Sequence, residues 1–139
     1  MDKQQIIKVM GFGTFDGVHP GHVFFLKQLK SLGDEVRLVI ARDSSVTSIK
    51  GGKPDYNENQ RFTMMNDLSI ADSIVLGDPD DHYKVIHEYK PNLIGLGYDQ
   101  HANLSELEKI FPDINIIRLE SLKPNQYKSS IIKKNGLDS

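Results

Sequence analysis

Two histidines three residues apart, with a proline-glycine pair between them, are the best candidates for chemistry in this sequence. They form the segment His19-Pro20-Gly21-His22, which follows an apolar run at residues 6–12. If Pro20 or Gly21 opens a helix, the free backbone amides of the helix start and the positive end of its dipole face the same volume as both imidazoles. Such a volume favours an anion, so the segment is a candidate phosphate-binding loop.

Two simpler explanations of this segment stay open. His19 and His22 could cap a helix while Asp16 completes a turn. They could also begin a zinc site, but no third ligand stands at a convincing spacing, and the other three of the five histidines are scattered along the chain. The sequence has no cysteine, so disulfides, thiolate metal sites and a cysteine nucleophile are excluded, and catalysis must use His, Lys, Arg, Asp or Ser. We expect no metal site made of protein side chains.

The chain around this loop alternates short apolar runs with amphipathic segments. Val23, Leu26, Leu29 and Leu32 recur at three-residue spacing and end before Gly33, as in a helix with a glycine stop. Strands are expected at residues 6–12, 36–41, 72–77, 92–97 and 114–118, and further helices at 57–68, 82–89 and 103–111, with a last one starting within 129–134. Strands that alternate with helices imply a parallel sheet covered on both faces. The sequence therefore predicts an α/β, doubly wound, five-stranded parallel sheet whose ligands bind beyond the carboxyl ends of the strands.

Composition narrows the class of protein. The chain has 139 residues, near the common size of one domain, and 38% of them are hydrophobic, enough for an ordinary core. Its 17 basic and 19 acidic residues give a net charge of -2, which argues against nucleic-acid binding through general phosphate neutralisation. There is no long apolar run and no signal peptide at the amino terminus. We expect a single domain over residues 1–139, in the cytoplasm and without a membrane partner.

The first loop also carries a resemblance. Residues 13–22 resemble the G-T-F-D-x-x-H-x-G-H pattern of the cytidylyltransferase-like nucleotidyltransferases, and every fixed position is present. The resemblance runs from about residue 9 to residue 133 and implies a Rossmann-like nucleotidyltransferase fold. It also implies an in-line attack of an acceptor phosphate on the α-phosphorus of a nucleoside triphosphate.

The resemblance assigns roles to the residues of this loop. It implies that His19 and His22 are catalytic and contact the nucleotide phosphates, with His22 closest to the developing charge. It implies Mg²⁺ or another divalent cation, because several phosphates approach one another, and it implies a homodimer. The residues expected to bind the nucleotide in this loop are Thr14, Phe15, His19, Pro20, Gly21 and His22.

Two basic segments later in the chain are candidates for phosphate contacts. Residues 50–54 form a basic segment with two glycines, which predicts a flexible loop that can fold over phosphates. Lys50 or Lys53 could then contact the triphosphate, and the alternative is a solvated surface loop. Residues 57–61 resemble the family's acidic-x-x-Arg helix start, which places Arg61 near the acceptor phosphate or the β-phosphate. The alternative is a capping box made by Asn57 and Gln60, and both can hold at once. We take Lys53 as a third catalytic residue and Arg61 as a substrate-phosphate residue.

The end of the chain matches the family more loosely. Tyr127, Ser129 and Ser130 stand where the family has a serine/threonine segment that closes on the nucleotide phosphates, although its usual arginine-threonine-glutamate lead-in is missing here. Hydroxyls and amides at a helix start suit that role, and a plain N-cap is the competing explanation.

The substrates are indicated by the segment after the fourth expected strand. Residues 97–100, Gly-Tyr-Asp-Gln, together with residues 41–43 and 50–54, most resemble the archaeal FAD synthases, which transfer AMP from ATP to FMN. Asp99 is the nucleotide-binding residue expected there. The alternative is a cytidylyltransferase that joins CTP to a small alcohol phosphate such as glycerol 3-phosphate. A nucleotide-binding sensor without turnover is a third hypothesis, and the intact His19 and His22 argue against it.

Overall fold

The computed structural model describes residues 5–50, 52–98, 100 and 102–121. These residues form one sheet whose strands are β1 (Lys8–Gly13), β2 (Glu35–Ile40), β3 (Ser73–Leu76), β4 (Leu93–Leu96) and β5 (Asn115–Arg118). Their order is β3-β2-β1-β4-β5, and every neighbouring pair is parallel. The predicted doubly wound, five-stranded parallel sheet is confirmed. The winding reverses between β1 and β4, which is where such sheets bind their ligands.

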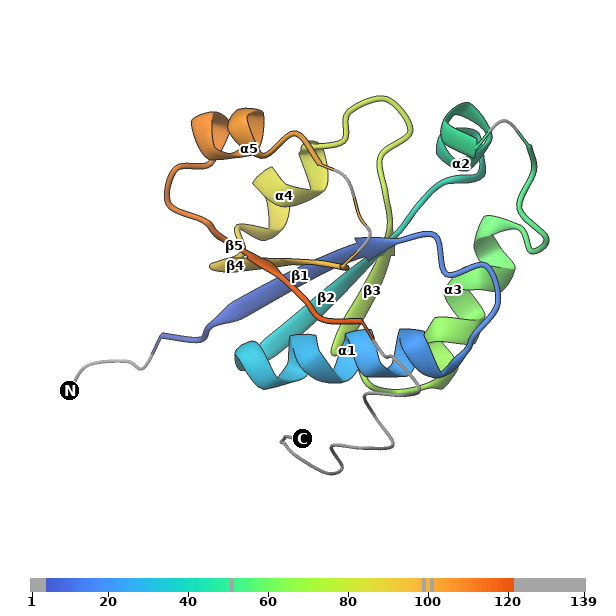
Figure 1. Cartoon of the computed structure of the whole chain (residues 1–139), viewed down its shortest axis with the longest axis horizontal. Helices are drawn as coiled ribbons and strands as arrows, with labels where there is room; N and C mark the ends of the chain where they lie inside the picture. Colours follow the sequence, from blue (N-terminus) through green and yellow to red (C-terminus); the bar gives the residue numbers. More distant parts are fainter. Residues whose placement is uncertain (1–4, 51, 99, 101, 122–139) are drawn as a thin grey trace.

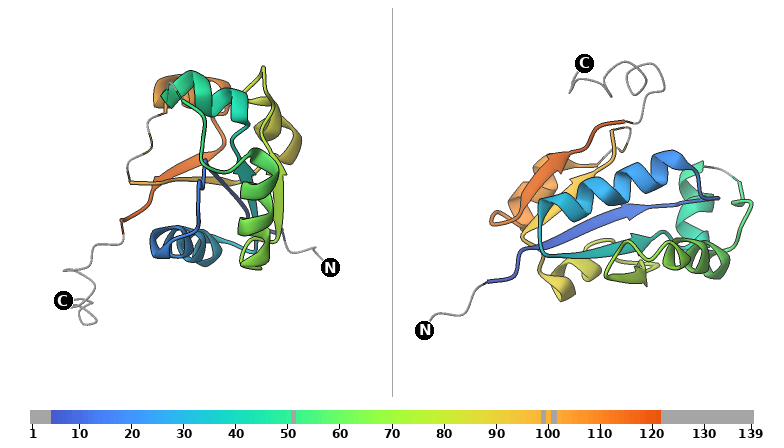
Figure 2. Two further views of the ribbon diagram at one scale, coloured as in Figure 1. Left: turned by 90° about the vertical axis from the view of Figure 1, so that its right-hand side faces the viewer. Right: turned by 90° about the horizontal axis from the view of Figure 1, so that it is seen from below.

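Helices cover both faces of this sheet (Figures 1 and 2). Helices α1 (Pro20–Leu32) and α3 (Glu58–Asp67) pack on one face, and α4 (Lys84–Tyr89) and α5 (Leu104–Ile110) on the other. Successive residues of β1 feed opposite cores, Val9 toward α1 and Met10 toward α4, because side chains alternate along a strand. None of the helices in the described ranges is long and apolar enough to span a membrane.

Helix α2 (Asp43–Lys50) corrects the expectation for the chain after β2. The sequence predicts a basic loop from Lys50, whereas Lys50 is the last residue of a helix. The helix is hard to recognise because its Ser and Thr residues have low helix propensity, and among residues 43–47 only Val46 is buried. The other boundaries lie within two residues of those expected. The helix expected within 129–134 lies outside the described residues.

Two strand glycines let α1 lie close to the point where the winding reverses. A Cβ added at Gly11 of β1 would lie 2.5 Å from a methyl carbon of Leu29, and one at Gly95 of β4 would lie 2.4 Å from the other methyl carbon of Leu29. Leu29 on α1 is fully buried between these two strands. The absence of side chains at Gly11 and Gly95 therefore allows the helix that begins with the histidine segment to pack directly over β1 and β4.

Candidate active site

The start of α1 is built around His19. His19 is the N-cap residue with an extended backbone, and Pro20 is the first residue of the helix, where the missing N–H of proline costs nothing. The backbone N–H of Gly21 donates to Nδ1 of His19 at 3.1 Å. Since Nδ1 accepts this bond, a neutral His19 carries its proton on Nε2. His19 is exposed, so this N–H is a donor available to a ligand.

His22 lies against His19 one turn into the helix. Their rings stack with centroids 3.7 Å apart, and Phe15 meets His22 edge-on at 5.1 Å. The Nδ1 atom of His22 is buried and has no hydrogen-bond partner among the described residues. Buried polar atoms in native proteins are usually paired, so this nitrogen is a candidate to contact a bound ligand.

The environment of His22 also sets its charge. Burial, and then the charge of His19, lower the pKa of His22 from its usual 6.5 to about 4, while a hydrogen bond with the backbone of Gly17 acts in the opposite direction. Without a ligand His22 is therefore neutral at pH 7. A phosphate beside the ring would raise this pKa again, because an opposite charge favours the protonated form.

The loop before these histidines is held in one shape. Phe15 has a left-handed backbone with φ of 54°, which is uncommon for a bulky residue. Its ring lies under Gly13, where an added Cβ would be 2.5 Å from the ring. The carboxylate of Asp16 accepts hydrogen bonds from the backbone N–H groups of Asp55 at 2.7 Å and Tyr56 at 2.9 Å. Asp16 therefore ties the histidine loop to the segment that leads into α3.

Arg61 is buried among protein groups. Its side chain is 0% exposed, and its role at a substrate phosphate stays a prediction. The guanidinium is held by four hydrogen bonds, to the carbonyl oxygens of Tyr56, Thr14 and Ala41 and to a carboxylate oxygen of Asp43. Arg61 thus joins the carboxyl ends of β1 and β2 to α2. The capping box of Asn57 and Gln60 is confirmed.

The roles of the other expected site residues stay predictions. Lys53 is exposed on the segment between α2 and α3, and its catalytic role stays a prediction. Asp99, Tyr127, Ser129 and Ser130 lie outside the described residues.

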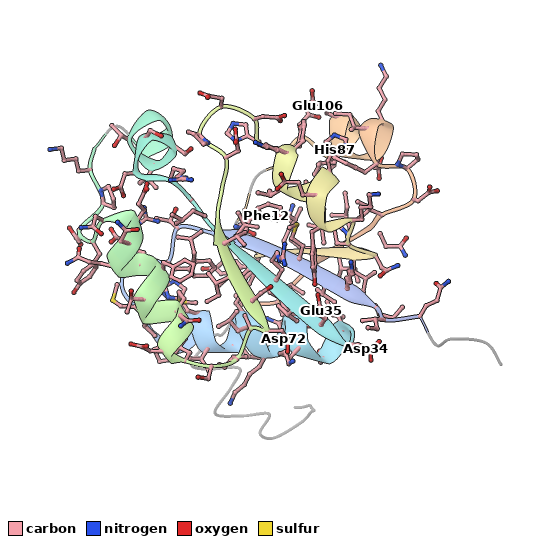
Figure 3. All side chains as sticks on the ribbon, turned by 180° about the vertical axis from the view of Figure 1, so that it is seen from behind. Phe12, Asp34, Glu35, Asp72, His87 and Glu106 are labelled. Carbon is pink, nitrogen blue, oxygen red and sulfur yellow. The ribbon has the colours of Figure 1, made fainter. Side chains whose placement is uncertain are left out.

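A cavity of about 410 Å³ opens on the opposite face of the sheet from α1, at the carboxyl ends of β1, β2 and β4. Figure 3 shows Phe12, which lines it, where β1 ends near α4, and shows Asp34 and Asp72 near the opposite end of the sheet. Gly13 and Thr14, which lead from β1 into the histidine loop, also line the cavity. Its apolar wall is formed by Phe12, Val39, Ile86, Ile94, Leu96 and Leu107.

Hydrogen bonds fix two sides of this cavity. The side chain of Gln100 accepts from the backbone N–H of Gly97 at 2.7 Å and donates to the carbonyl of Phe12 at 2.6 Å, which ties the turn after β4 to the end of β1. Tyr83, the N-cap residue of α4, donates to Glu106 on α5. Both Gln100 and Tyr83 line the cavity, so its shape is set before a ligand binds.

Sequence reasoning missed most of this cavity. Arg42, Ser45, Asp78 and His82 line it beside the residues named above, and none of them was expected to act in the site. Their positions after the second and third strands were a signal, because parallel strands end at the same edge of a sheet.

Comparison with known proteins shows the family to which the chain belongs. The Cytidylyltransferase-like family matches residues 10–135, and the protein belongs to that family. The FAD synthase of Picrophilus torridus is 42% identical over 110 residues, which is 79% of this chain and 78% of that protein. The FAD synthase of Thermoplasma volcanium is 37% identical over 133 residues, 93% of each chain.

Solved structures give the same fold. The lipopolysaccharide core biosynthesis protein from Thermoplasma volcanium GSS1 aligns with a TM-score of 0.79 at 36% identity, over 86% of this chain and 100% of that one. The pantoate-beta-alanine ligase from Francisella tularensis aligns with a TM-score of 0.60 at 19% identity, which shows the fold alone. The Rossmann-like nucleotidyltransferase fold expected from the sequence is confirmed.

Proposed function

We propose that this protein is a nucleotidyltransferase that transfers AMP from ATP to FMN and releases FAD and pyrophosphate. The observation that carries the proposal is the meeting of two half-sites at the end of β1. The paired histidines lie on the α1 side and the apolar cavity lies on the α4 and α5 side, joined by Gly13 and Thr14. The relatives named FAD synthase, 37 to 45% identical to this chain, support the same reaction.

The cavity favours FMN as the acceptor. Its volume of about 410 Å³ lies within the range of roughly 300 to 1,000 Å³ that is usual for small-molecule sites. Its apolar wall can bury a flat ring system such as that of a flavin. Glycerol 3-phosphate, the acceptor of the alternative cytidylyltransferase, is small and polar and would leave this wall in contact with water.

The reaction needs donors more than a nucleophilic side chain. A phosphate oxygen of FMN attacks the α-phosphorus of ATP, and the bond from that phosphorus to pyrophosphate breaks in line with the attack. Nε2–H of His19 can donate to a phosphate oxygen. His22 can donate to the oxygens of the α-phosphate as their charge grows. Donors fixed in place before the reaction stabilise this charge most effectively.

Mg²⁺, or another divalent cation, is part of the proposal. Among the described residues, no three His, Asp or Glu side chains gather in a group that could hold a metal ion. We propose that the cation would be held by the phosphates of ATP and by water, as Mg²⁺ often is. It would offset part of the phosphate charge when bound. We also propose, on the family resemblance, that the protein acts as a homodimer in the cytoplasm, and gel filtration tests the dimer.

The experiment is to incubate the purified protein with Mg²⁺, FMN and either ATP or CTP, and to measure FAD by chromatography and pyrophosphate release. We expect FAD from ATP, and no product when FMN is omitted. CTP turnover with glycerol 3-phosphate, together with no reaction of FMN, would show the alternative cytidylyltransferase. Binding of ATP without pyrophosphate release from any phosphorylated acceptor would show the sensor.

A further inference from the structure

A phosphorylated acceptor needs a cation in the cavity. Its phosphate carries about two negative charges at pH 7, and placing these against a mostly apolar wall is costly unless they are paired. Among the described residues that line the cavity, Arg42 is the only lysine or arginine. It is the second residue after β2. The end of β2 lies beside β1, because the backbone N–H of Ala41 donates to the carbonyl of Gly13 at 2.9 Å.

The guanidinium of Arg42 is held in place by protein groups on one side. Its Nε donates to the carbonyl of Gly77 at 2.6 Å, and its Nη1 donates to Glu58 at 3.1 Å. The other carboxylate oxygen of Glu58 accepts from the backbone N–H of Asp43 at 2.9 Å, so Glu58 is itself fixed. The end of β3 and the start of α3 therefore set the orientation of the guanidinium before any ligand is present.

The remaining N–H groups of Arg42 make no hydrogen bond to another described residue. Two of its five N–H groups make the bonds just described, and Nη2 has no partner among the described residues. The side chain is 34% exposed, which agrees with its place on the cavity wall. Ser45, on the same wall, adds a hydroxyl. An arginine with free N–H groups can bind two oxygens of one phosphate, which lysine cannot do with the same geometry.

We propose that Arg42, with Ser45, binds the phosphate of the acceptor and makes the cavity select a phosphorylated flavin over the same flavin without phosphate. The inference rests on the proposed function, since it takes the cavity as the acceptor site. Thr14 lines the same cavity and begins the loop that leads to His19. Arg42 and the start of the histidine loop therefore lie on the wall of one cavity.

The test compares binding of FMN and riboflavin, without ATP, by quenching of flavin fluorescence. We expect the protein to bind FMN at least about 10-fold more tightly than riboflavin, since a hydrogen bond to a charged group has about that effect or more. Arg42→Gln should weaken FMN binding by about 10- to 100-fold and leave riboflavin binding nearly unchanged. Lys27→Gln is the matched control. Lys27 is exposed on α1, and its substitution removes the same charge as Arg42→Gln.

Two further variants test the same phosphate contact in case Arg42→Gln does not fold. Arg42→Lys keeps the charge but loses the two-point contact, and Ser45→Ala removes one hydroxyl. Both should lower the ratio of FMN to riboflavin affinity, by less than Arg42→Gln, while thermal unfolding shows that they are folded. In FAD synthesis, these variants should raise the KM for FMN and leave the KM for ATP unchanged.

The outcomes separate the inference from the proposed function. If the unaltered protein makes FAD but binds FMN and riboflavin equally, or if Arg42→Gln weakens both flavins alike, the inference is wrong and the function stands. A rise in the KM for ATP alone would assign Arg42 to the nucleotide and also overturn the inference. If the unaltered protein binds neither flavin and makes no FAD, the proposed function fails, and the inference fails with it.

Discussion

Replacement of His22 by alanine separates a role in the reaction from a role in capping α1. The backbone N–H of His22 donates to the carbonyl of His19 at 2.9 Å, and the substitution keeps this bond. The N-cap bond from Gly21 to the His19 ring also does not involve the His22 side chain. The helix should therefore still begin at Pro20 in the variant.

The change in stability is expected to be small because two effects oppose each other. The variant loses the ring contacts of His22 with His19 and Phe15, which are worth roughly 1 to 2 kcal/mol for a partly buried side chain. It also removes a buried nitrogen that has no partner, and such an atom costs roughly 1 to 3 kcal/mol. We expect the free energy of unfolding to change by no more than about 1 kcal/mol.

The change in rate is expected to be much larger. Loss of one preorganised donor at a developing charge lowers kcat by about 10² to 10³, or roughly 3 to 4 kcal/mol. The assay measures FAD formation at saturating ATP and FMN, with ATP binding and thermal unfolding measured on the same preparation. His87→Ala is the matched control, because His87 is an exposed histidine on α4 that contacts Phe111 and does not line the cavity.

A folded His22→Ala protein that keeps its turnover within about threefold of the unaltered protein would refute this reasoning and leave His22 with a structural role. A similar loss in His87→Ala would also refute it, because the effect would then not depend on the α1 site.

Three further predictions concern stability. Because the pKa of His22 is lowered from 6.5 to about 4 in the folded protein, the unfolded chain binds more protons between these values, so stability falls as the pH drops through that window. After allowance for solvent screening, the loss of stability across this window is about 1 to 2 kcal/mol. Urea unfolding at pH 7 and pH 4.5 should show this loss in the unaltered protein but not in His22→Ala. Arg61→Met leaves three carbonyls and a carboxylate without their donor. This substitution should lower the free energy of unfolding by about 3 kcal/mol and the Tm by about 10 °C. A Tm unchanged within about 2 °C would contradict the hydrogen bonds described for Arg61. Gly11→Ala should cost about 1 to 3 kcal/mol, because its Cβ meets the buried Leu29, whereas Gly52→Ala, with nothing within 4 Å, should change stability by less than about 0.5 kcal/mol.

The elements of the fold and the histidine loop followed from local sequence patterns. The apolar runs of the five strands and the three-residue spacing in α1 are encoded by neighbouring residues, so the parallel sheet and most helix boundaries could be predicted. The start of α1 at Pro20 and the capping box of Asn57 and Gln60 are also local, since each depends on residues within one turn. Helix α2 was missed because its Ser and Thr residues have low helix propensity.

The burial of Arg61 and the cavity were decided by the tertiary structure. The acceptors of the Arg61 guanidinium include carbonyl oxygens 20 and 47 residues away, and no local pattern shows that they enclose a charged side chain. The cavity wall likewise combines residues from β1, β2 and β4 with residues from α4 and α5. The sequence by itself determined that His19 and His22 would stand at the start of a helix after β1. Only the packing of strands far apart in the chain decided that Arg42, and not Arg61, would face a cavity, because burial depends on which distant groups supply the hydrogen-bond acceptors.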